Sequence, residues 1–174
     1  MPLKGQVAVV TGASRGIGRA IASRLASEGA DLVLGARGVD GVEAAGAALA
    51  EEYPDGRFLP VGCDVSSWDS VSELMDRTVE KFEKIDFLIN NAGITRDNLV
   101  MRMKKEEWDD VLAANLTGVF NTCRLAARQM LRQRAGRIVN ITSVVGLLGN
   151  AGQVNYAASK GGIISLTYSL AREM

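Results

Sequence analysis

The chain has 174 residues, the length of one domain, and its 47% hydrophobic and 23% charged residues are typical of a globular protein rather than a disordered one. Its 20 Lys and Arg residues balance its 20 Asp and Glu residues, which argues against a strongly electrostatic partner such as nucleic acid. Because it has no histidine, a Ser-His-Asp triad, a histidine-ligated metal site and a histidine general base are all excluded.

Short apolar runs alternate along the chain with stretches of helical spacing. Strands are predicted at residues 7–10, 32–36, 57–63, 86–90 and 137–142, and helices at residues 17–28, 42–52, 67–82, 106–133 and 154–174. This alternation predicts a single α/β domain over residues 1–174. Its fold would be a doubly wound parallel sheet, a Rossmann fold, with helices on both faces.

Several sequence features bear on where the protein works. Cys63 and Cys123 form no CxxC pair, so we expect two reduced, apolar cysteines and no metal site. The N-terminus lacks the pattern of a secretory signal, and no apolar run approaches the roughly 20 residues that span a bilayer. We therefore expect a cytoplasmic protein without a membrane partner.

The first strand and the first helix are joined by a glycine-rich turn, Thr11-Gly12-Ala13-Ser14-Arg15-Gly16-Ile17-Gly18. Glycines at such a turn let the backbone approach a pyrophosphate, which rests on the helix N-terminus. The spacing is GxxxGxG rather than GxGxxG, and by itself it also fits a plain tight turn. A P-loop is excluded because no Lys-Ser/Thr follows, and a GxSxG nucleophile elbow because it needs a histidine.

Two arginines bear on the choice of nucleotide. Arg37 follows the second strand, where NAD-binding proteins carry an acidic residue for the ribose 2′-hydroxyl. A cation there favours a 2′-phosphate, and Arg15 in the glycine-rich turn could supply a second one. Either residue alone could be a solvated surface arginine, but the pair favours NADPH/NADP as the cofactor.

Tyr156 and Lys160 lie four residues apart in a predicted helix and so share one face. A nearby ammonium lowers the pKa of a phenol from about 10, which makes a tyrosine usable as a proton donor. Ser143 follows the fifth strand, at the edge of a parallel sheet where ligands bind. Tyr-x-x-x-Lys also occurs on ordinary exposed helices. It indicates a catalytic pair here only because the same chain also has the nucleotide-binding turn.

These residues resemble those of the short-chain dehydrogenase/reductase family. The matching motifs are Thr11 to Gly18, Asp64-Val65, Asn90-Asn91-Ala92-Gly93, Asn115 within ANLTGVF, Ser143, and Tyr156-Ala157-Ala158-Ser159-Lys160. They follow the family's order and extend over nearly the whole chain, so the match is highly specific.

The resemblance implies a role for each matching residue. Tyr156 would be the catalytic acid, and Lys160 would bind the nicotinamide ribose and lower the pKa of Tyr156. Ser143 would hold the substrate carbonyl, and Asn115 a water that links Lys160 to solvent. The cofactor would contact Gly12, Ser14, Arg15, Gly16, Ile17, Gly18, Arg37, Asp64, Val65, Asn91, Ala92, Gly93, Tyr156 and Lys160. The implied reaction is hydride transfer from NADPH to a ketone.

A closer likeness narrows the implied substrate. The stretches NNAGITRDNLVMRMKKEEWDDVLAANLTGVF, SVVGLLGNAGQVNYAASKGG and SLAREM are similar to those of β-ketoacyl-[acyl-carrier-protein] reductases of fatty acid biosynthesis, part of lipid metabolism. The implied substrate is a 3-oxoacyl thioester carried by acyl carrier protein or coenzyme A. Acetoacetyl-CoA, in which coenzyme A is the carrier, and ketones of another kind stay open as alternatives. An arginine run from Arg124 to Arg137 could dock an acidic carrier or simply form a solvated helix face.

The family also implies a homo-oligomer, a tetramer or dimer, in which Val119, Phe120, Ile163 and Leu166 fit helices that contact a neighbouring copy. Members of the family usually continue past this point with further strands and a substrate lid, so the chain is C-terminally short relative to them. We therefore expect an open edge on the fifth strand and weak or no turnover. The alternative function is a nucleotide-binding or oligomerising fragment without turnover.

Overall fold

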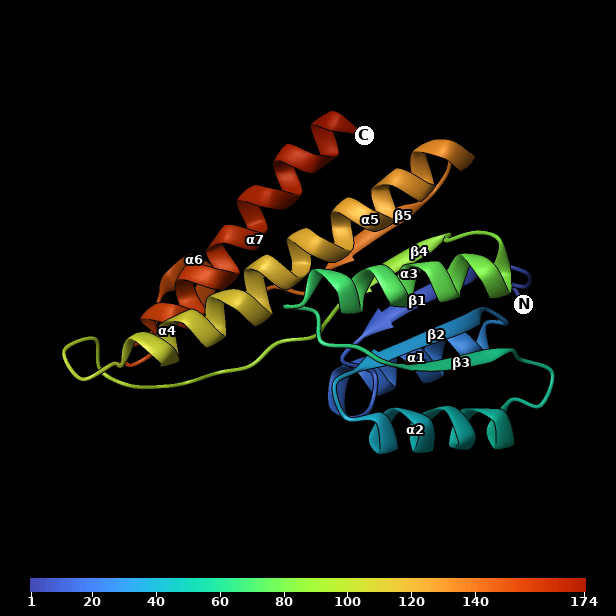
Figure 1. The fold of residues 1–174 in the computed structure, drawn as a ribbon, viewed down its shortest axis with the longest axis horizontal. Helices are drawn as coiled ribbons and strands as arrows, with labels where there is room; N and C mark the ends of the chain where they lie inside the picture. Colours follow the sequence, from blue (N-terminus) through green and yellow to red (C-terminus); the bar gives the residue numbers. More distant parts are fainter.

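The computed structural model describes residues 1–174 as one parallel five-stranded sheet flanked by helices (Figure 1). The strands are β1 (Val7–Thr11), β2 (Asp31–Ala36), β3 (Phe58–Gly62), β4 (Phe87–Asn90) and β5 (Arg137–Asn140). The helices are α1 (Gly16–Ser27), α2 (Val39–Glu52), α3 (Trp68–Phe82), α4 (Lys105–Leu112), the π-helical η1 (Ala113–Thr117), α5 (Gly118–Gln133), α6 (Val145–Leu148) and α7 (Val154–Glu173).

The strand order is β3-β2-β1-β4-β5, so the chain winds outward from β1 in one direction and then, from β4, in the other. Successive side chains of a strand point to opposite faces of the sheet. Val7 and Val9 pack with α3 and α5 on one face, whereas Ala8 and Val10 pack with α1 and α2 on the other. The predicted doubly wound fold is confirmed, with its switch point between β1 and β4.

The long helical stretch predicted at residues 106–133 is confirmed, but it is not α-helical throughout. The chain forms α4 and α5 joined by η1, a wide π-helical turn that carries the buried Asn115. Such a turn inserts about one residue into a helix, so the apolar spacing on either side still reads as helical. The apolar pattern therefore could not reveal the interruption.

The other differences from the predicted elements are small. Helix α2 begins at Val39, three residues before the predicted start at residue 42, and α6 was not predicted. A helix of four residues is too short to show a period. The predicted start of α3 is confirmed, because the Ser67 side chain accepts a hydrogen bond of 3.3 Å from the Ser70 N–H.

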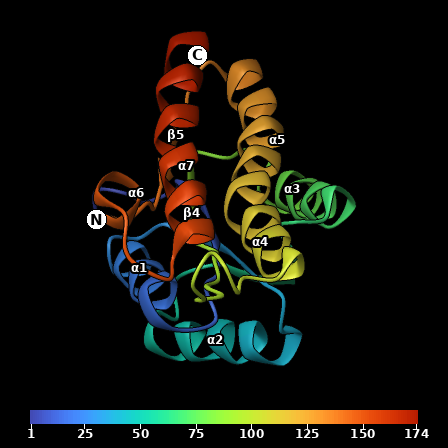
Figure 2. The ribbon, with the colours of Figure 1, turned by 90° about the vertical axis from the view of Figure 1, so that its left-hand side faces the viewer.

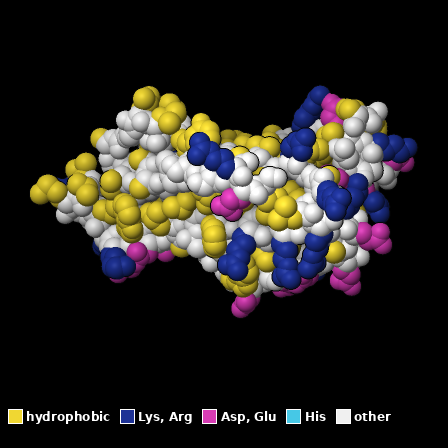
Figure 3. All heavy atoms as spheres, turned by 90° about the horizontal axis from the view of Figure 1, so that it is seen from above, with side chains coloured by type: hydrophobic (Ala, Val, Ile, Leu, Met, Phe, Trp, Pro, Cys, Tyr) yellow, Lys and Arg dark blue, Asp and Glu magenta, His cyan; other side chains and the backbone are white.

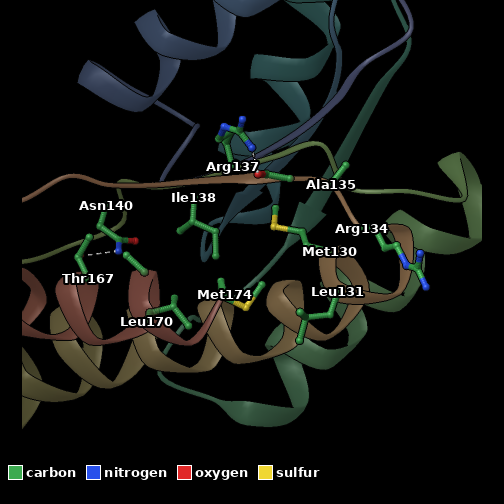
Figure 4. Close-up of a pocket in the computed structure, with 12 residues that line it drawn as sticks. Met130, Leu131, Arg134, Ala135, Arg137, Ile138, Asn140, Thr167, Leu170 and Met174 are labelled. Carbon is green, nitrogen blue, oxygen red and sulfur yellow. Dashed lines mark hydrogen bonds between the residues drawn. The ribbon is translucent and has the colours of Figure 1, made fainter.

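Strand β5 pairs only with β4, so its far side is an open edge, as expected from the sequence. A groove of about 490 Å³ lies beside this edge, between β5 and helices α5 and α7. Figure 4 shows the apolar side chains of Met130, Ile138 and Leu170 in this groove. At its polar end, Asn140 Nδ2 donates a 2.9 Å hydrogen bond to Thr167 Oγ1.

Helices α5 and α7 run side by side (Figure 2). Val119 and Ile163, which we expected to contact a neighbouring copy, are buried in the chain's own core instead. Leu166 also packs partly against that core, whereas Phe120 is exposed. The apolar pattern of a helix does not distinguish residues that pack in the chain's own core from residues that contact another copy. None of the helices combines the length and the apolar character needed to cross a bilayer.

Candidate active site

The carboxyl ends of the parallel strands meet at one edge of the sheet, where a hollow of about 590 Å³ opens. The glycine-rich turn after β1, the segments after β2, β3 and β4, and one residue of η1 surround it. Its lining residues are Gly12, Ser14, Arg15, Gly16, Ile17, Ala36, Arg37, Gly38, Cys63, Asp64, Val65, Asn91, Ala92, Gly93, Ile94 and Ala114. Every residue predicted to contact the cofactor lines this hollow except Gly18, Tyr156 and Lys160.

The glycine-rich turn has a backbone that only glycine accommodates. Gly12 has a φ of +65°, and a Cβ on it would lie 2.8 Å from Asn91 Nδ2 and 2.9 Å from Ala92 Cα. Gly18 packs against the same turn, because a Cβ on it would overlap the Gly12 carbonyl oxygen and Asn91 Nδ2. Helix α1 begins at Gly16 without a side-chain cap, so its first N–H groups are free to bind a ligand. This shape fits the pyrophosphate of a dinucleotide.

A latch across the switch point holds this turn in place. Thr11 Oγ1 accepts 3.1 Å hydrogen bonds from the N–H groups of both Asn91 and Ala92. In return, Asn91 Nδ2 donates to the carbonyl oxygens of Thr11 and Gly12 at 3.1 and 3.2 Å. The ends of β1 and β4 are thus locked together. Thr11 was not predicted as a site residue, although its place at the start of the glycine motif was a signal.

The segment after β3 forms another wall of the hollow. Asp64 Oδ1 accepts 2.9 and 2.7 Å hydrogen bonds from the Ser66 N–H and hydroxyl. Asn121 of α5 donates a 3.1 Å hydrogen bond to the Val65 carbonyl, and a Cβ on Gly118 would lie 2.7 Å from Val65 Cγ2. Helix α5 therefore sets the position of this wall. Asn121 and Gly118 were missed because nothing in the sequence pairs them with residue 65.

Lys160 is buried beside the end of β5. Its Nζ donates a 2.8 Å hydrogen bond to the Ile141 carbonyl and lies 5.7 Å from the centroid of the Tyr156 ring, so the two predicted catalytic residues do share a face of α7. Thr142 Oγ1 donates at 2.8 Å to the Lys160 carbonyl. Two contacts thus tie this turn of α7 to the segment that follows β5.

Ser143 belongs to the same segment. It is half-buried, and its hydroxyl oxygen accepts a 3.2 Å hydrogen bond from the Val145 N–H at the start of α6. Helix α6 packs on α7 so closely that a Cβ on Gly146 would lie 2.7 Å from the Lys160 carbonyl carbon. The residues on both sides of Ser143 are therefore anchored at Lys160.

Asn115 connects the hollow to this cluster. Its side chain is buried, donating to the Ile94 carbonyl at 3.0 Å and to Ser159 Oγ at 3.1 Å while accepting from the Ile94 N–H at 2.8 Å. A Cβ on Gly93 would lie 3.1 Å from Asn115 Oδ1 and 3.7 Å from Lys160 Nζ. Gly93 thus separates the hollow from Lys160. The water-holding role expected of Asn115 stays a prediction.

The two cysteines are buried thiols. Burial raises the pKa of Cys63, which lines the hollow, and raises that of Cys123 in α5 to about 11. Both therefore stay protonated near neutral pH, which makes them poor nucleophiles. Lys160 shows the opposite shift, because burial disfavours its ammonium and lowers its pKa.

The shift at Lys160 predicts a pH dependence of stability. With a lysine pKa of about 10.4, the unfolded chain binds more protons than the folded protein between the lowered pKa and that value. The contribution of Lys160 to stability should therefore rise with pH in this window, whereas the two buried thiols contribute a fall. The free energy of unfolding of the parent minus that of Lys160→Met isolates the lysine and should rise with pH. Urea unfolding between about pH 7 and about pH 10, in a Tyr156→Phe background, measures it. If the difference in unfolding free energy between the parent and Lys160→Met did not vary with pH, the pKa of Lys160 would not be lowered by burial.

Comparison with known proteins gives a clear set of relatives. Residues 6–174 match the family model described as short chain dehydrogenase. The 3-oxoacyl-[acyl-carrier-protein] reductase FabG of Vibrio cholerae is 47% identical over 174 residues, 100% of this chain and 69% of that protein. Its namesake from Staphylococcus aureus is 51% identical over 168 residues, 96% of this chain and 68% of that protein.

A solved structure gives the same result. The crystal structure of levodione reductase matches with a TM-score of 0.95 at 39% identity, covering 98% of this chain and 67% of that one. The chain is therefore similar to reductases in sequence and in fold, and it spans 67–69% of the length of these relatives.

Proposed function

The chain belongs to the short chain dehydrogenase family, and from that membership we propose that it uses NADPH to reduce a 3-oxoacyl thioester to the 3-hydroxyacyl thioester. The family and its named reductases imply an oxidoreductase with a nicotinamide cofactor. The observation that carries the proposal is one continuous arrangement: a glycine cradle, a hollow and, across Gly93, the buried Lys160 beside Tyr156.

The mechanism follows from what each side chain can do. When bound, the cofactor supplies a hydride for the ketone carbon. Tyr156 donates its phenolic proton to the ketone oxygen, so that the carbonyl becomes an alcohol. The ammonium of Lys160, held by the Ile141 carbonyl, stabilises the negative charge left on the Tyr156 oxygen. Ser143 donates a hydrogen bond to the same ketone oxygen and so orients the carbonyl.

The choice of NADPH is supported by two cations without partners. Arg15 directly precedes α1 and Arg37 directly follows β2, and both line the hollow. Neither forms an ion pair with an acidic residue of the chain. Both guanidinium groups are therefore available for the 2′-phosphate that distinguishes NADPH from NADH.

Arg37→Asp is expected to lower kcat/KM for NADPH by about 10- to 100-fold and to improve the use of NADH relative to NADPH, because a charged hydrogen bond contributes about 1.5–3 kcal/mol. Steady-state rates with both nucleotides measure the effect. Arg77→Asp on α3 is the control, because it changes the net charge equally at a residue outside the hollow. An unchanged preference in Arg37→Asp would exclude Arg37 from the phosphate site.

The surface near Ser143 suits a substrate with an acyl chain. Val144, Leu147 and Leu148 around α6 are 62%, 72% and 81% exposed, and Leu99, Val100 and Met101 add further apolar surface. Hydrophobic side chains gather at the left-hand end in Figure 3, the end that carries α4 in Figure 1. This surface and the names of the relatives support a 3-oxoacyl group carried by acyl carrier protein or coenzyme A, with a place in fatty acid synthesis.

Only some of the arginines of α5 are available for the proposed interaction with a carrier protein. Arg124 lies over the Trp68 ring, with 5.0 Å between its Cζ and the ring centroid, and is therefore held by a neighbour. Arg128 and Arg132 are exposed and form no ion pair. These two residues could bind an acidic carrier protein.

We further propose that the protein works in the cytoplasm as a single domain and as a homo-oligomer, a dimer or tetramer. Support for the oligomer comes from the paired helices α5 and α7, which expose Phe120 by 46%, Leu131 by 57% and Tyr168 by 69%. Large apolar and aromatic side chains exposed on neighbouring helices mark a surface for association.

A comparison of rates with different substrates distinguishes our proposal from two competing functions, a reductase of other ketones and a nucleotide-binding protein without turnover. Rates are measured with a 3-oxoacyl thioester on acyl carrier protein, the same acyl group on coenzyme A, and a ketone without a thioester. Our proposal predicts the highest kcat/KM with a thioester. A preference for the plain ketone would favour a reductase of another class, and NADPH binding without turnover of any substrate would favour a purely nucleotide-binding role.

A further inference from the structure

Asn155 directly precedes Tyr156, and the mechanism above does not use it. Its side chain is completely buried, at 0% exposure, in the first turn of α7. Its Nδ2 donates two hydrogen bonds, to the Arg96 carbonyl at 2.9 Å and to the Glu107 carbonyl at 3.0 Å. Its Oδ1 accepts a 2.8 Å hydrogen bond from the Tyr156 N–H. One buried amide therefore joins three separate segments.

The segment on the other side of these contacts is the strap, residues 94–103, which leads from β4 to α4. From Ile94 to Leu99 the strap has no helix or strand, so its position depends on contacts with its neighbours. Asn115 holds the strap at Ile94, and Asn155 holds it at Arg96. The strap begins right after Gly93, the residue that separates the hollow from Lys160.

We propose that Asn155 is a positioning residue for the reaction: its amide locks the first turn of α7 to the strap and to α4, and thereby sets Tyr156 relative to the hollow. This inference rests on the proposed function, because it matters to catalysis only if Tyr156 is the proton donor. Tyr156 is the third residue of α7, where the first N–H groups have no partner within the helix. Asn155 supplies that partner and at the same time anchors the turn to the strap.

The chemistry of the site requires an amide. Two carbonyl oxygens accept hydrogen bonds from Nδ2, while the Tyr156 N–H donates one to Oδ1. Aspartate keeps the acceptor but brings a carboxylate against two carbonyl oxygens, and alanine removes all three hydrogen bonds. These two substitutions therefore separate the start of the helix from the tie to the strap.

A matched control comes from the strap itself. Asn98 Nδ2 donates to the Arg102 carbonyl and to Glu107 Oε2, both at 3.2 Å. Like Asn155, it is an asparagine with two acceptors, one of them on Glu107, but its side chain donates no hydrogen bond to α7. Asn98→Ala thus removes an equivalent amide without touching the turn that carries Tyr156.

The test compares Asn155→Ala, Asn155→Asp and Asn98→Ala in two measurements. In the first, kcat with a 3-oxoacyl thioester should fall by about 10- to 100-fold in both Asn155 variants, because a displacement of about 1 Å in a catalytic group has effects of this size. The Kd for NADPH, from its fluorescence, should change less than about threefold, because the glycine cradle lies elsewhere. Asn98→Ala should keep kcat within about twofold.

In the second measurement, amide hydrogen exchange of a peptide covering residues 153–157 reports on the turn without any substrate. Exchange should accelerate in Asn155→Ala, which loses the acceptor for the Tyr156 N–H, and should stay slow in Asn155→Asp and Asn98→Ala. If Asn155→Ala does not fold, Asn155→Asp carries the test by its fall in kcat at unchanged NADPH affinity.

Three results would overturn the inference. The first is a kcat within about twofold of the parent in a folded, NADPH-binding Asn155 variant. The second is an equal fall of kcat in Asn98→Ala, which would mean that any loosening of the strap has this effect. The third is parental exchange in residues 153–157 of Asn155→Ala. An absence of 3-oxoacyl turnover in the parent would instead contradict the proposed function, and the exchange measurement then decides whether Asn155 holds the turn.

Discussion

Gly18→Ala is expected to weaken NADPH binding by about 10- to 100-fold, because overpacking of a tight site has an energetic effect of about 1–3 kcal/mol. The added Cβ would lie 2.5 Å from Asn91 Nδ2 and inside the contact distance of the Gly12 carbonyl oxygen. These are two atoms of the latch between the ends of β1 and β4. The methyl group therefore has to displace either the latch or the start of α1, and both line the hollow.

Fluorescence titration with NADPH measures this effect directly. Gly41→Ala in α2 is the control, because its Cβ would meet only Ser14 Cβ at an ordinary 3.5 Å. Alanine is also the better helix former, so Gly41→Ala should bind NADPH normally and unfold at an equal or higher temperature. Normal NADPH affinity in Gly18→Ala would show that the nucleotide does not use the glycine cradle.

Tyr156→Phe is expected to lower kcat for 3-oxoacyl reduction by about 100- to 10,000-fold, the usual contribution of a positioned general acid. The Tyr156 hydroxyl forms no hydrogen bond within the protein, so its removal leaves no buried group unpaired. We therefore expect the fold and the NADPH affinity to be preserved. The loss would then belong to the chemical step alone.

Rates of NADPH oxidation together with NADPH affinity test this prediction. Tyr168→Phe is the matched control, because Tyr168 lies on the same helix with 69% exposure and no hydrogen bond of its hydroxyl within the protein. Its turnover should equal that of the parent. If Tyr156→Phe kept more than about a tenth of the parental kcat, Tyr156 would not be the proton donor.

The features that the sequence predicted well depend on patterns of neighbouring residues, such as apolar runs and glycine spacing. Buried parallel strands appear as continuous apolar runs, and the glycines at positions 12 and 18 mark the turn because no other residue fits there. These patterns sufficed for the doubly wound sheet, whereas the open β5 edge was expected from the resemblance to longer family members. The patterns also marked the turn after β1 as a nucleotide site, whereas the lining residues after β3 and β4 were predicted from the family resemblance.

The features that it missed depend on contacts between distant segments. Asn155 meets the Arg96 carbonyl across 59 positions of the chain, and Asn121 meets the Val65 carbonyl across 56. Each asparagine donates to a backbone carbonyl, which every residue has, so the sequence does not show which residue will accept the hydrogen bond. The π-helical turn at Asn115 was missed for a related reason, because that side chain also hydrogen-bonds to backbone groups of a distant residue, Ile94.

The central claim is that this chain transfers a hydride from NADPH to a 3-oxoacyl thioester. The most direct test is NADPH consumption by the purified chain with that thioester, followed by identification of the product by mass spectrometry. We expect slow turnover, as the open β5 edge implies, in which NADPH oxidation and 3-hydroxyacyl thioester formation proceed in equal amounts. NADPH that binds the chain but is not consumed would contradict the claim and would leave a nucleotide-binding protein without turnover.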